Sequence, residues 1–170
     1  AKAQERHPPF RNRIEPWTWT DTKLPQSLSP AIGFDWVTVF GVMHHVFGEP
    51  QRLELLRFAA QQLRPGGCLS VSLWDFGAHG RYKAKYLKWE AFSHTWGLDI
   101  DTLGAGDFLL GWGSDTEHPR YCHWVDREEE KRLIDAVSAD PNLGLMPGLK
   151  VGSSKDLNRY WCWTRGASTV

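Results

Sequence analysis

The sequence lacks several features that would place it in a special class of protein. No stretch approaches the ~20 consecutive apolar residues of a membrane-spanning helix, so we expect no membrane partner. Charge of one sign is not in excess either, because 20 lysines and arginines balance 20 aspartates and glutamates. Binding of a nucleic acid would therefore require a local basic patch, since the molecule as a whole has no strong field.

Cysteine is scarce, and its spacing does not indicate a disulfide framework. The three cysteines are Cys68, Cys122 and Cys162, an odd number without a C-x-x-C pair. This usage is typical of a reducing compartment, so we expect a cytoplasmic protein. The start, AKAQERHPPF, also lacks an initiator methionine and an apolar signal region, and it resembles neither a secretory leader nor an intact natural terminus. We therefore interpret the chain as truncated.

The composition itself is that of an ordinary globular protein. Hydrophobic residues make up 41% and charged residues 24% of the 170 residues, close to average usage. A chain of this length can bury roughly two-thirds of its unfolded surface. We therefore predict a single domain over residues 1–170.

The centre of the sequence predicts a strand, a helix and a second strand. Phe34–Val42 is a continuous apolar and β-branched run, typical of a strand buried on both faces of a parallel sheet. Glu49–Leu63 has apolar residues at helical spacing, with Pro50 suited to the first turn and the Pro-Gly-Gly sequence at 65–67 ending the helix. Cys68–Trp74 is a short apolar strand. The short connections indicate a right-handed parallel crossover.

The flanking segments predict four further elements. Arg13–Thr20 and Arg159–Thr164 are rich in residues that favour strands, whereas Tyr82–Phe92 and Asp126–Val137 have helical periodicity. This order of elements indicates an α/β layer fold whose C-terminal elements close the edge of the sheet.

Candidate functional residues follow the predicted strands, because ligands bind beyond the carboxyl ends of strands in an open parallel sheet. These residues are Asp21, the segment Gly41–Val46 and the segment Trp74–Phe76. The second segment reads G-V-M-H-H-V, in which the glycine allows a backbone to approach a ligand. Adjacent histidines rarely point at the same ion, and a third ligand at metal-site spacing is lacking, so we predict no metal site.

The central unit resembles a known family. FDWVTVFGVMHHV, the helix after it and LRPGGCLSVSLW are similar in order and spacing to the fourth strand, helix and fifth strand of class I S-adenosylmethionine-dependent methyltransferases. The resemblance implies an enzyme that uses S-adenosyl-L-methionine and has a partial Rossmann-like fold, strands 3 to 7 of the doubly wound sheet with the last strand antiparallel. The family's glycine-rich loop and its ribose-contacting acidic residue would precede residue 1, so the chain would be the C-terminal portion of the core.

The resemblance also implies roles for individual residues. Asp21 would face the adenine amino group of the cofactor, although an aspartate in such a loop is equally suited to cap a helix or turn. His44 and His45 would lie near the methyl-transfer site, and the alternative for His45 is a hydrogen-bonded wall residue. The residues that would line the methionine part of the cofactor are Gly41, Val42 and Met43.

Two glycine-rich segments are not interpreted as the cofactor loop. Gly104–Asp107 and Gly111–Gly113 follow the fifth strand and lack the strand–glycine–helix context, so we predict turns there. An Asp/Asn-Pro-Pro-aromatic signature after the fourth strand is also lacking. Its absence argues against an amino-group methyltransferase that acts on DNA.

A narrower resemblance covers most of the chain. The double histidine, L-R-P-G-G, the tryptophan ending the fifth strand, G-D-F-L-L-G-W, and R-Y-C-H-W-V before an acidic helix look like the wobble-uridine tRNA carboxymethyl methyltransferases and their bacterial relatives. The resemblance implies methylation of a carboxymethyl group on a tRNA base. Such a carboxylate is already ionised near pH 7, so positioning is the main task and no strong general base is needed.

An arginine that holds the carboxylate in a bidentate fork suits this chemistry. Arg120 is the candidate, with Tyr121 and His123 beside it, because R-Y-C-H matches the family's substrate-side motif. The alternative is a surface arginine that precedes a helix.

The segment from Arg81 to Trp89 alternates cations with aromatic rings. Cations that contact phosphates and rings that stack on bases are what an RNA groove requires, so we expect tRNA as a partner. The alternative is an amphipathic helix whose rings face the core and whose lysines are merely solvated. The cations are Arg81, Lys83, Lys85 and Lys88, and the rings are Tyr82, Tyr86 and Trp89.

Two other functions remain open at this point. A small-molecule methyltransferase can use the same scaffold, because a fold does not fix the substrate. A non-catalytic remnant or RNA-binding partner would keep the sheet without binding the cofactor. A small helper subunit is a further partner that the resemblance allows.

Overall fold

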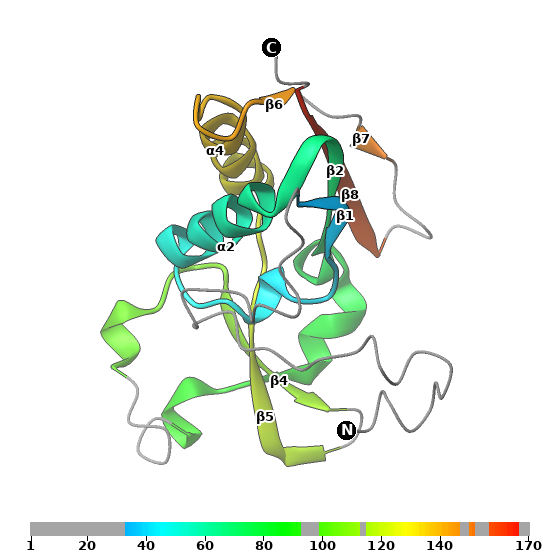
Figure 1. Ribbon diagram of the computed structural model, residues 1–170. Coiled ribbons are helices and arrows are strands. Elements are labelled where there is room, and N and C mark those ends of the chain that lie inside the picture. Colours follow the sequence, from blue (N-terminus) through cyan, green and yellow to red (C-terminus); the bar gives the residue numbers. More distant parts are fainter. Residues whose placement is uncertain (1–32, 93–98, 113–114, 147–149, 152–156, 167–170) are drawn as a thin grey trace, which may run out of the picture.

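The computed structural model describes residues 33–92, 99–112, 115–146, 150–151 and 157–166 (Figure 1). These residues form two β-sheets and two α-helices, together with short 3-10 turns. None of the helices in these ranges is long and apolar enough to span a membrane.

The main sheet begins with the predicted strand–helix–strand unit. Strand β1 (Phe34–Val39) is parallel to β2 (Leu63–Trp74), and helix α2 (Glu49–Gln61) connects them. Pro50 lies in the first turn of α2, where its missing N–H would have no partner in any case. The predicted unit and its parallel pairing are confirmed, but the prediction that the first strand is buried on both faces is wrong, because Trp36 is 63% exposed. Among the described residues β1 lies at one edge of the sheet.

The Pro-Gly-Gly sequence at residues 65–67 does not end the helix, contrary to the prediction. The helix ends at Gln61, and the three residues lie inside β2 as a bulge, where the register changes from Phe34 opposite Leu63 to Trp36 opposite Cys68. The physical reason is close contact, because a Cβ atom on Gly67 would lie 2.7 Å from the carbonyl oxygen of Phe34. The bulge therefore lengthens β2 at its start.

The last strand closes the sheet in the antiparallel direction. Strand β8 (Asn158–Arg165) pairs with β2, and the short strands β6 (Leu145–Met146) and β7 (Lys150–Val151) pair with β8. The order β1-β2-β8-β6 confirms the predicted antiparallel last strand. The predicted strand Arg13–Thr20 lies outside the described residues.

Helices α2 and α4 cover the same face of the main sheet (Figure 1). Helix α4 (Arg127–Ser138) confirms the predicted helix, and it begins after Asp126, whose side chain accepts a hydrogen bond from the Glu129 N–H at 2.8 Å as an N-cap residue should. The apolar core between the helices and the sheet contains Leu55, Leu56, Leu69, Val71, Leu73, Leu133, Val137 and Trp163.

The second sheet lies beneath the main sheet in Figure 1 and is antiparallel. It consists of β3 (Tyr86–Leu87), β4 (Asp107–Trp112) and β5 (Asp115–His123). The turn predicted at Gly104–Asp107 is present just before β4, where the Asp107 N–H donates to the Gly104 carbonyl at 3.0 Å. Of the other glycine-rich segment, Gly111 lies within β4 and not in the predicted turn.

The predicted helix Tyr82–Phe92 is wrong. Two 3-10 turns, Gly80–Lys85 and Trp89–Ala91, flank strand β3 instead. Tyr86 pairs with Leu110 across the sheet, and its ring packs 4.5 Å from the ring of Phe108. Pairing with a distant strand requires an extended backbone, so it overrides the local helical pattern.

Candidate functional site

The candidate site lies where β1 ends. Gly41 follows the strand with φ of 69°, and its N–H donates to the Ser72 hydroxyl on β2 at 3.1 Å. The position of a Cβ on Gly41 has no atom within 4 Å, so the backbone is open to a ligand on that side. Val42 is exposed, whereas Met43 is fully buried.

The two histidines after Met43 have different environments. His44 is only 8% exposed, and its ring lies 5.0 Å from the ring of Trp74 at the end of β2. Burial, followed by the charges of His45 and Arg120, lowers the pKa of His44 to about 3. His44 is therefore a neutral imidazole at physiological pH.

His45 is exposed and connects the loop to the second sheet. Its Nδ1 lies 2.9 Å from the backbone carbonyl oxygen of Tyr121 on β5. A carbonyl oxygen can only accept, so Nδ1 carries the proton and donates. This contact brings the segment after β1 next to the strand that carries the predicted substrate-side residues.

Arg120 lies in the same region of the molecule. Its guanidinium carbon is 5.3 Å from the centre of the Trp74 ring, a cation–π arrangement, and its charge acts on His44. The structure thus brings three residues together from separate elements: His44 after β1, Trp74 at the end of β2 and Arg120 on β5.

Tyr121 and His123 point into the interior, where they contact acidic residues. The Tyr121 hydroxyl donates to Asp107 Oδ1 at 2.6 Å, and burial together with Asp107 raises the pKa of Tyr121. The ring of His123 lies between Asp107 and Glu129, with 2.6 Å on each side. Glu129 in turn is paired with Arg52 at 2.7 Å.

Sequence reasoning missed three members of this buried cluster. Asp107 had been assigned only to a turn and Glu129 only to an acidic helix, whereas Arg52 had no role beyond lying in the predicted helix. A glycine-aspartate pair before a strand is a weak signal that the aspartate is buried. An arginine among the leucines of a helix gives no such signal, because helical periodicity does not tell which cations are buried. Between Tyr121 and His123, burial raises the pKa of the Cys122 thiol to about 11, so this thiol stays protonated.

The alternating cations and rings at residues 81–89 differ in solvent exposure. Arg81, Lys83, Lys85 and Lys88 are exposed, whereas the rings between them are partly buried. Tyr82 packs 5.2 Å from Trp74, and the cations of Arg81 and Lys85 lie 5.0 and 5.9 Å from the centre of the Tyr82 ring. Arg81 and Lys85 therefore lie next to the candidate site.

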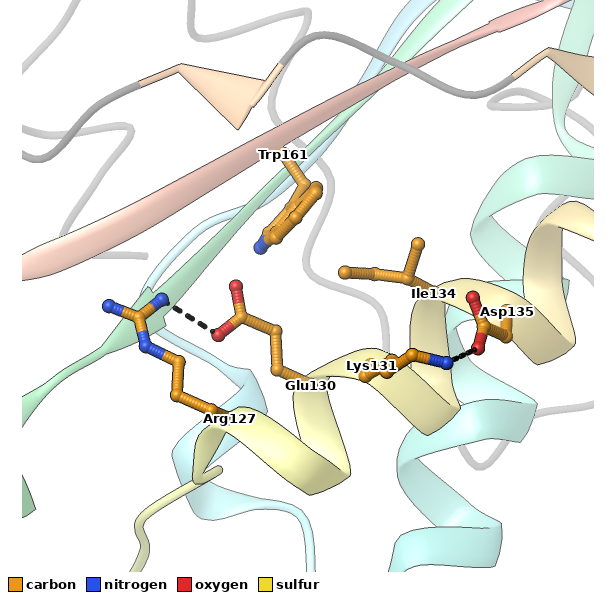
Figure 2. Close-up of a pocket in the computed structure, with 6 residues that line it drawn as sticks. All are labelled: Arg127, Glu130, Lys131, Ile134, Asp135 and Trp161. Atoms are coloured by element: carbon orange, nitrogen blue, oxygen red, sulfur yellow. Dashed lines mark hydrogen bonds and ion pairs between the residues drawn. The ribbon is translucent and has the colours of Figure 1, made fainter.

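Two cavities lie elsewhere. One, of about 250 Å³, lies between α4 and β8, where Glu130 is paired with Arg127 and Lys131 with Asp135 (Figure 2). The other, of about 200 Å³, lies between β1 and α2. Neither is lined by a predicted site residue.

The last two predictions concern Asp21 and a metal site. Asp21 lies outside the described residues. Within the part of the chain that the structure describes, no group of three histidine, cysteine, aspartate or glutamate side chains is arranged to hold a metal ion.

Comparison with solved structures identifies the fold. A methyltransferase from Methanosarcina mazei is 14% identical over 81% of this chain and 61% of its own, with a TM-score of 0.50. One from Clostridium acetobutylicum is 12% identical over 97% of this chain and 71% of its own, with a TM-score of 0.54. The fold is that of S-adenosylmethionine-dependent methyltransferases.

The similarity confirms the predicted partial Rossmann-like α/β fold. The chain spans 61% of the length of the first of these structures. No protein-family model matches the sequence, and no curated protein matches it.

Proposed function

We propose that the chain is part of an S-adenosylmethionine-dependent methyltransferase. The observation that carries the proposal is the position of the segment Gly41–His45, which lies at the carboxyl end of β1 and beside Trp74 at the end of the parallel strand β2. Ligands of doubly wound sheets bind at this end of the strands. The fold shared with methyltransferases of known structure supports the same assignment.

The residues present fit a cofactor at this position. Gly41 leaves open space where a side chain would stand, and Val42 is exposed beside it. These two residues would hold the methionine part of the cofactor through the backbone and one apolar contact. When bound, S-adenosylmethionine supplies an electrophilic methyl group. The role of Asp21 at the adenine remains a prediction.

A carboxylate is the acceptor group that the neighbouring residues suit. Arg120 is partly buried beside the Trp74 ring, and an ion pair formed there is screened less than one on the surface. His44, with its pKa lowered to about 3, is too weak a base to remove a proton at neutral pH. An acceptor that is already ionised needs no such base, so the neutral histidine is compatible with it.

We propose a carboxymethyl group on a tRNA wobble uridine as the acceptor. The exposed cations Arg81 and Lys85 next to the site support an RNA partner, because cations near a site can bind phosphates. A small carboxylate is the second candidate. The Tyr82 ring favours a small carboxylate as the acceptor. This ring is partly buried and packs on Trp74, so less of it is free to stack on a base.

Calorimetry tests the cofactor first. The chain is first completed with the upstream segment in which the resemblance places the glycine-rich loop. Titration of this completed chain with S-adenosylmethionine should give heat of binding, and absence of that heat would favour the non-catalytic alternative. Methyl transfer to bulk tRNA and to small carboxylates then separates the two candidate acceptors.

Substitution of one arginine tests the acceptor site. Arg120→Ala should reduce turnover far more than cofactor affinity. Arg64→Ala is the matched control, because Arg64 is an exposed arginine near the opposite end of β2, paired with Asp35. An unchanged rate in Arg120→Ala would remove the proposed role of this residue.

A further inference from the structure

His123 lies between two carboxylates in a nearly dry environment. Its Nδ1 is 2.6 Å from Asp107 Oδ1 and its Nε2 is 2.6 Å from Glu129 Oε2. The exposed fractions of the three side chains are 9%, 8% and 7%. Water therefore competes little for these contacts.

Both nitrogens of His123 must donate. A neutral imidazole has one N–H and one bare nitrogen, and the bare nitrogen cannot bond to a carboxylate oxygen, which only accepts. Asp107 Oδ1 also accepts from the Tyr121 hydroxyl, so this oxygen already acts as an acceptor. The imidazolium, with two N–H groups, is the form of His123 that satisfies both contacts.

Glu129 extends the contacts toward the segment after β1. Its Oε1 lies 2.7 Å from both Nε and Nη2 of Arg52 on α2. The remaining Nη1 of Arg52 donates to the carbonyl oxygen of Val46 at 2.7 Å. One side of His123 is thus connected through Glu129 and Arg52 to Val46.

The Nδ1 side of His123 is connected through Asp107 to Tyr121 on the same strand. Asp107 accepts from the hydroxyl of Tyr121, and the backbone carbonyl of Tyr121 accepts from His45. The contacts therefore form a closed ring that begins at His45 and ends at Val46. This ring connects the loop after β1, both helices and the second sheet.

We propose that His123 is a positioning residue that, as an imidazolium between Asp107 and Glu129, holds the strand carrying Arg120 against the loop carrying His44. This inference rests on the proposed function, because the two parts that it holds together are the two sides of that site. His123 itself, with both ring nitrogens engaged, does not act on a substrate.

The charges around His123 favour its protonated form. With His123 charged, it and Arg52 balance the two carboxylates, whereas a neutral ring would leave one buried negative charge uncompensated. Burial alone would lower the pKa of His123, but the hydrogen bonds to Asp107 and Glu129 outweigh burial and raise it. The titratable groups that face His123 are Asp107 on β4, Tyr121 on β5, Glu129 on α4, and Arg52 and Glu49 on α2.

Nuclear magnetic resonance of the chain with ¹⁵N-labelled histidine rings tests the protonation state. Both ring nitrogens of His123 should remain protonated at pH values around and just above the ordinary histidine pKa of about 6.5. His44, with its pKa lowered to about 3, should show one bare nitrogen over the same range and serves as the internal reference. A bare nitrogen on His123 at pH 7 overturns the proposal.

A variant tests the coupling between the two parts of the site. His123→Gln should shift the signals of His45 and Arg120 while leaving those of the core residue Val71 unchanged. His118→Gln is the matched control, because His118 lies on the same strand but is exposed and paired only locally with Asp115. Unchanged His45 and Arg120 signals in His123→Gln overturn the proposal.

Neither measurement depends on the cofactor or the acceptor. Failure of the completed chain to bind S-adenosylmethionine would count against the proposed function and leave the histidine spectra as expected. The wild-type spectrum needs no variant, so it decides the protonation state whatever the stability of His123→Gln.

Discussion

The two sheets are held in place by different forces. The main sheet packs on α2 and α4 through a continuous apolar core that includes Leu69 and Val71. The second sheet packs on a smaller apolar cluster around Phe76 and Leu110, and buried charges also connect it to the same helices, with Asp107 and His123 on its strands and Glu129 on α4. Apolar packing has little directionality, whereas hydrogen-bonded charges fix distances and angles. The part that would hold a substrate is therefore the part that is attached by the more directional contacts.

Removing the carboxylate that connects the sheets should have the largest effect. Glu129→Ala leaves Arg52 and His123 buried without their partner, so the free energy of unfolding should fall by about 3–5 kcal/mol. Urea denaturation measures this change. Glu128→Ala is the control, since Glu128 is the exposed neighbour on the same helix. Equal stabilities of the two variants would show that charge does not hold the second sheet.

Truncating the apolar core should rank next. Leu69→Ala removes a fully buried side chain from β2, and such a cavity costs about 3 kcal/mol of unfolding free energy. Its effect should be the same at all pH values, because no charge is involved. Met146→Ala, at a position that is 53% exposed, should be nearly neutral in the same denaturation series.

The pH dependence of stability separates the two kinds of attachment. The pKa of His123 is raised in the folded state, so its contribution to the free energy of unfolding is complete below the unfolded pKa of about 6.5. The contribution is lost as pH rises through the folded pKa. Denaturation at a series of alkaline pH values should show this decline in the wild type. If the free energy of unfolding of His123→Gln declines by the same amount over this pH range, the decline belongs to another titratable group.

The smallest effect should come from the helix cap. Asp126→Ala removes the side chain that accepts from the Glu129 N–H, and loss of an N-cap costs about 1 kcal/mol. Thermal unfolding can detect this change. Asp135→Ala, on the exposed surface of α4 near its end, should cost less, and the reverse order would contradict the capping role.

The sequence was sufficient for the elements whose pattern is local. The apolar run from Phe34 and the helix that begins at Glu49 were predicted because burial of a strand or a helix face leaves a periodic record. The conformation of the segment from Tyr82 to Phe92 could not be predicted in this way, because it depends on pairing with β4, a distant part of the chain. Local periodicity carries no information about such a partner.

The candidate site was predictable only in part, for a related reason. Gly41 and His44 follow a recognisable strand, so their position at its carboxyl end could be expected from the fold. The proximity of Arg120 to Trp74 was not predicted, because the pairing of β4 with β5 determines where Arg120 lies. Arg52 and Glu129 are buried because α2 packs against α4, and no sequence pattern predicts this burial.

The bulge at Gly67 has a consequence for the far end of the sheet. A shift of one residue between paired strands turns every side chain to the opposite face, and the register after the bulge sets Val39 of β1 opposite Val71 of β2. That alignment places the hydroxyl of Ser72 under the N–H of Gly41. The geometry at the ligand-binding end of the two strands is thus set at their opposite end.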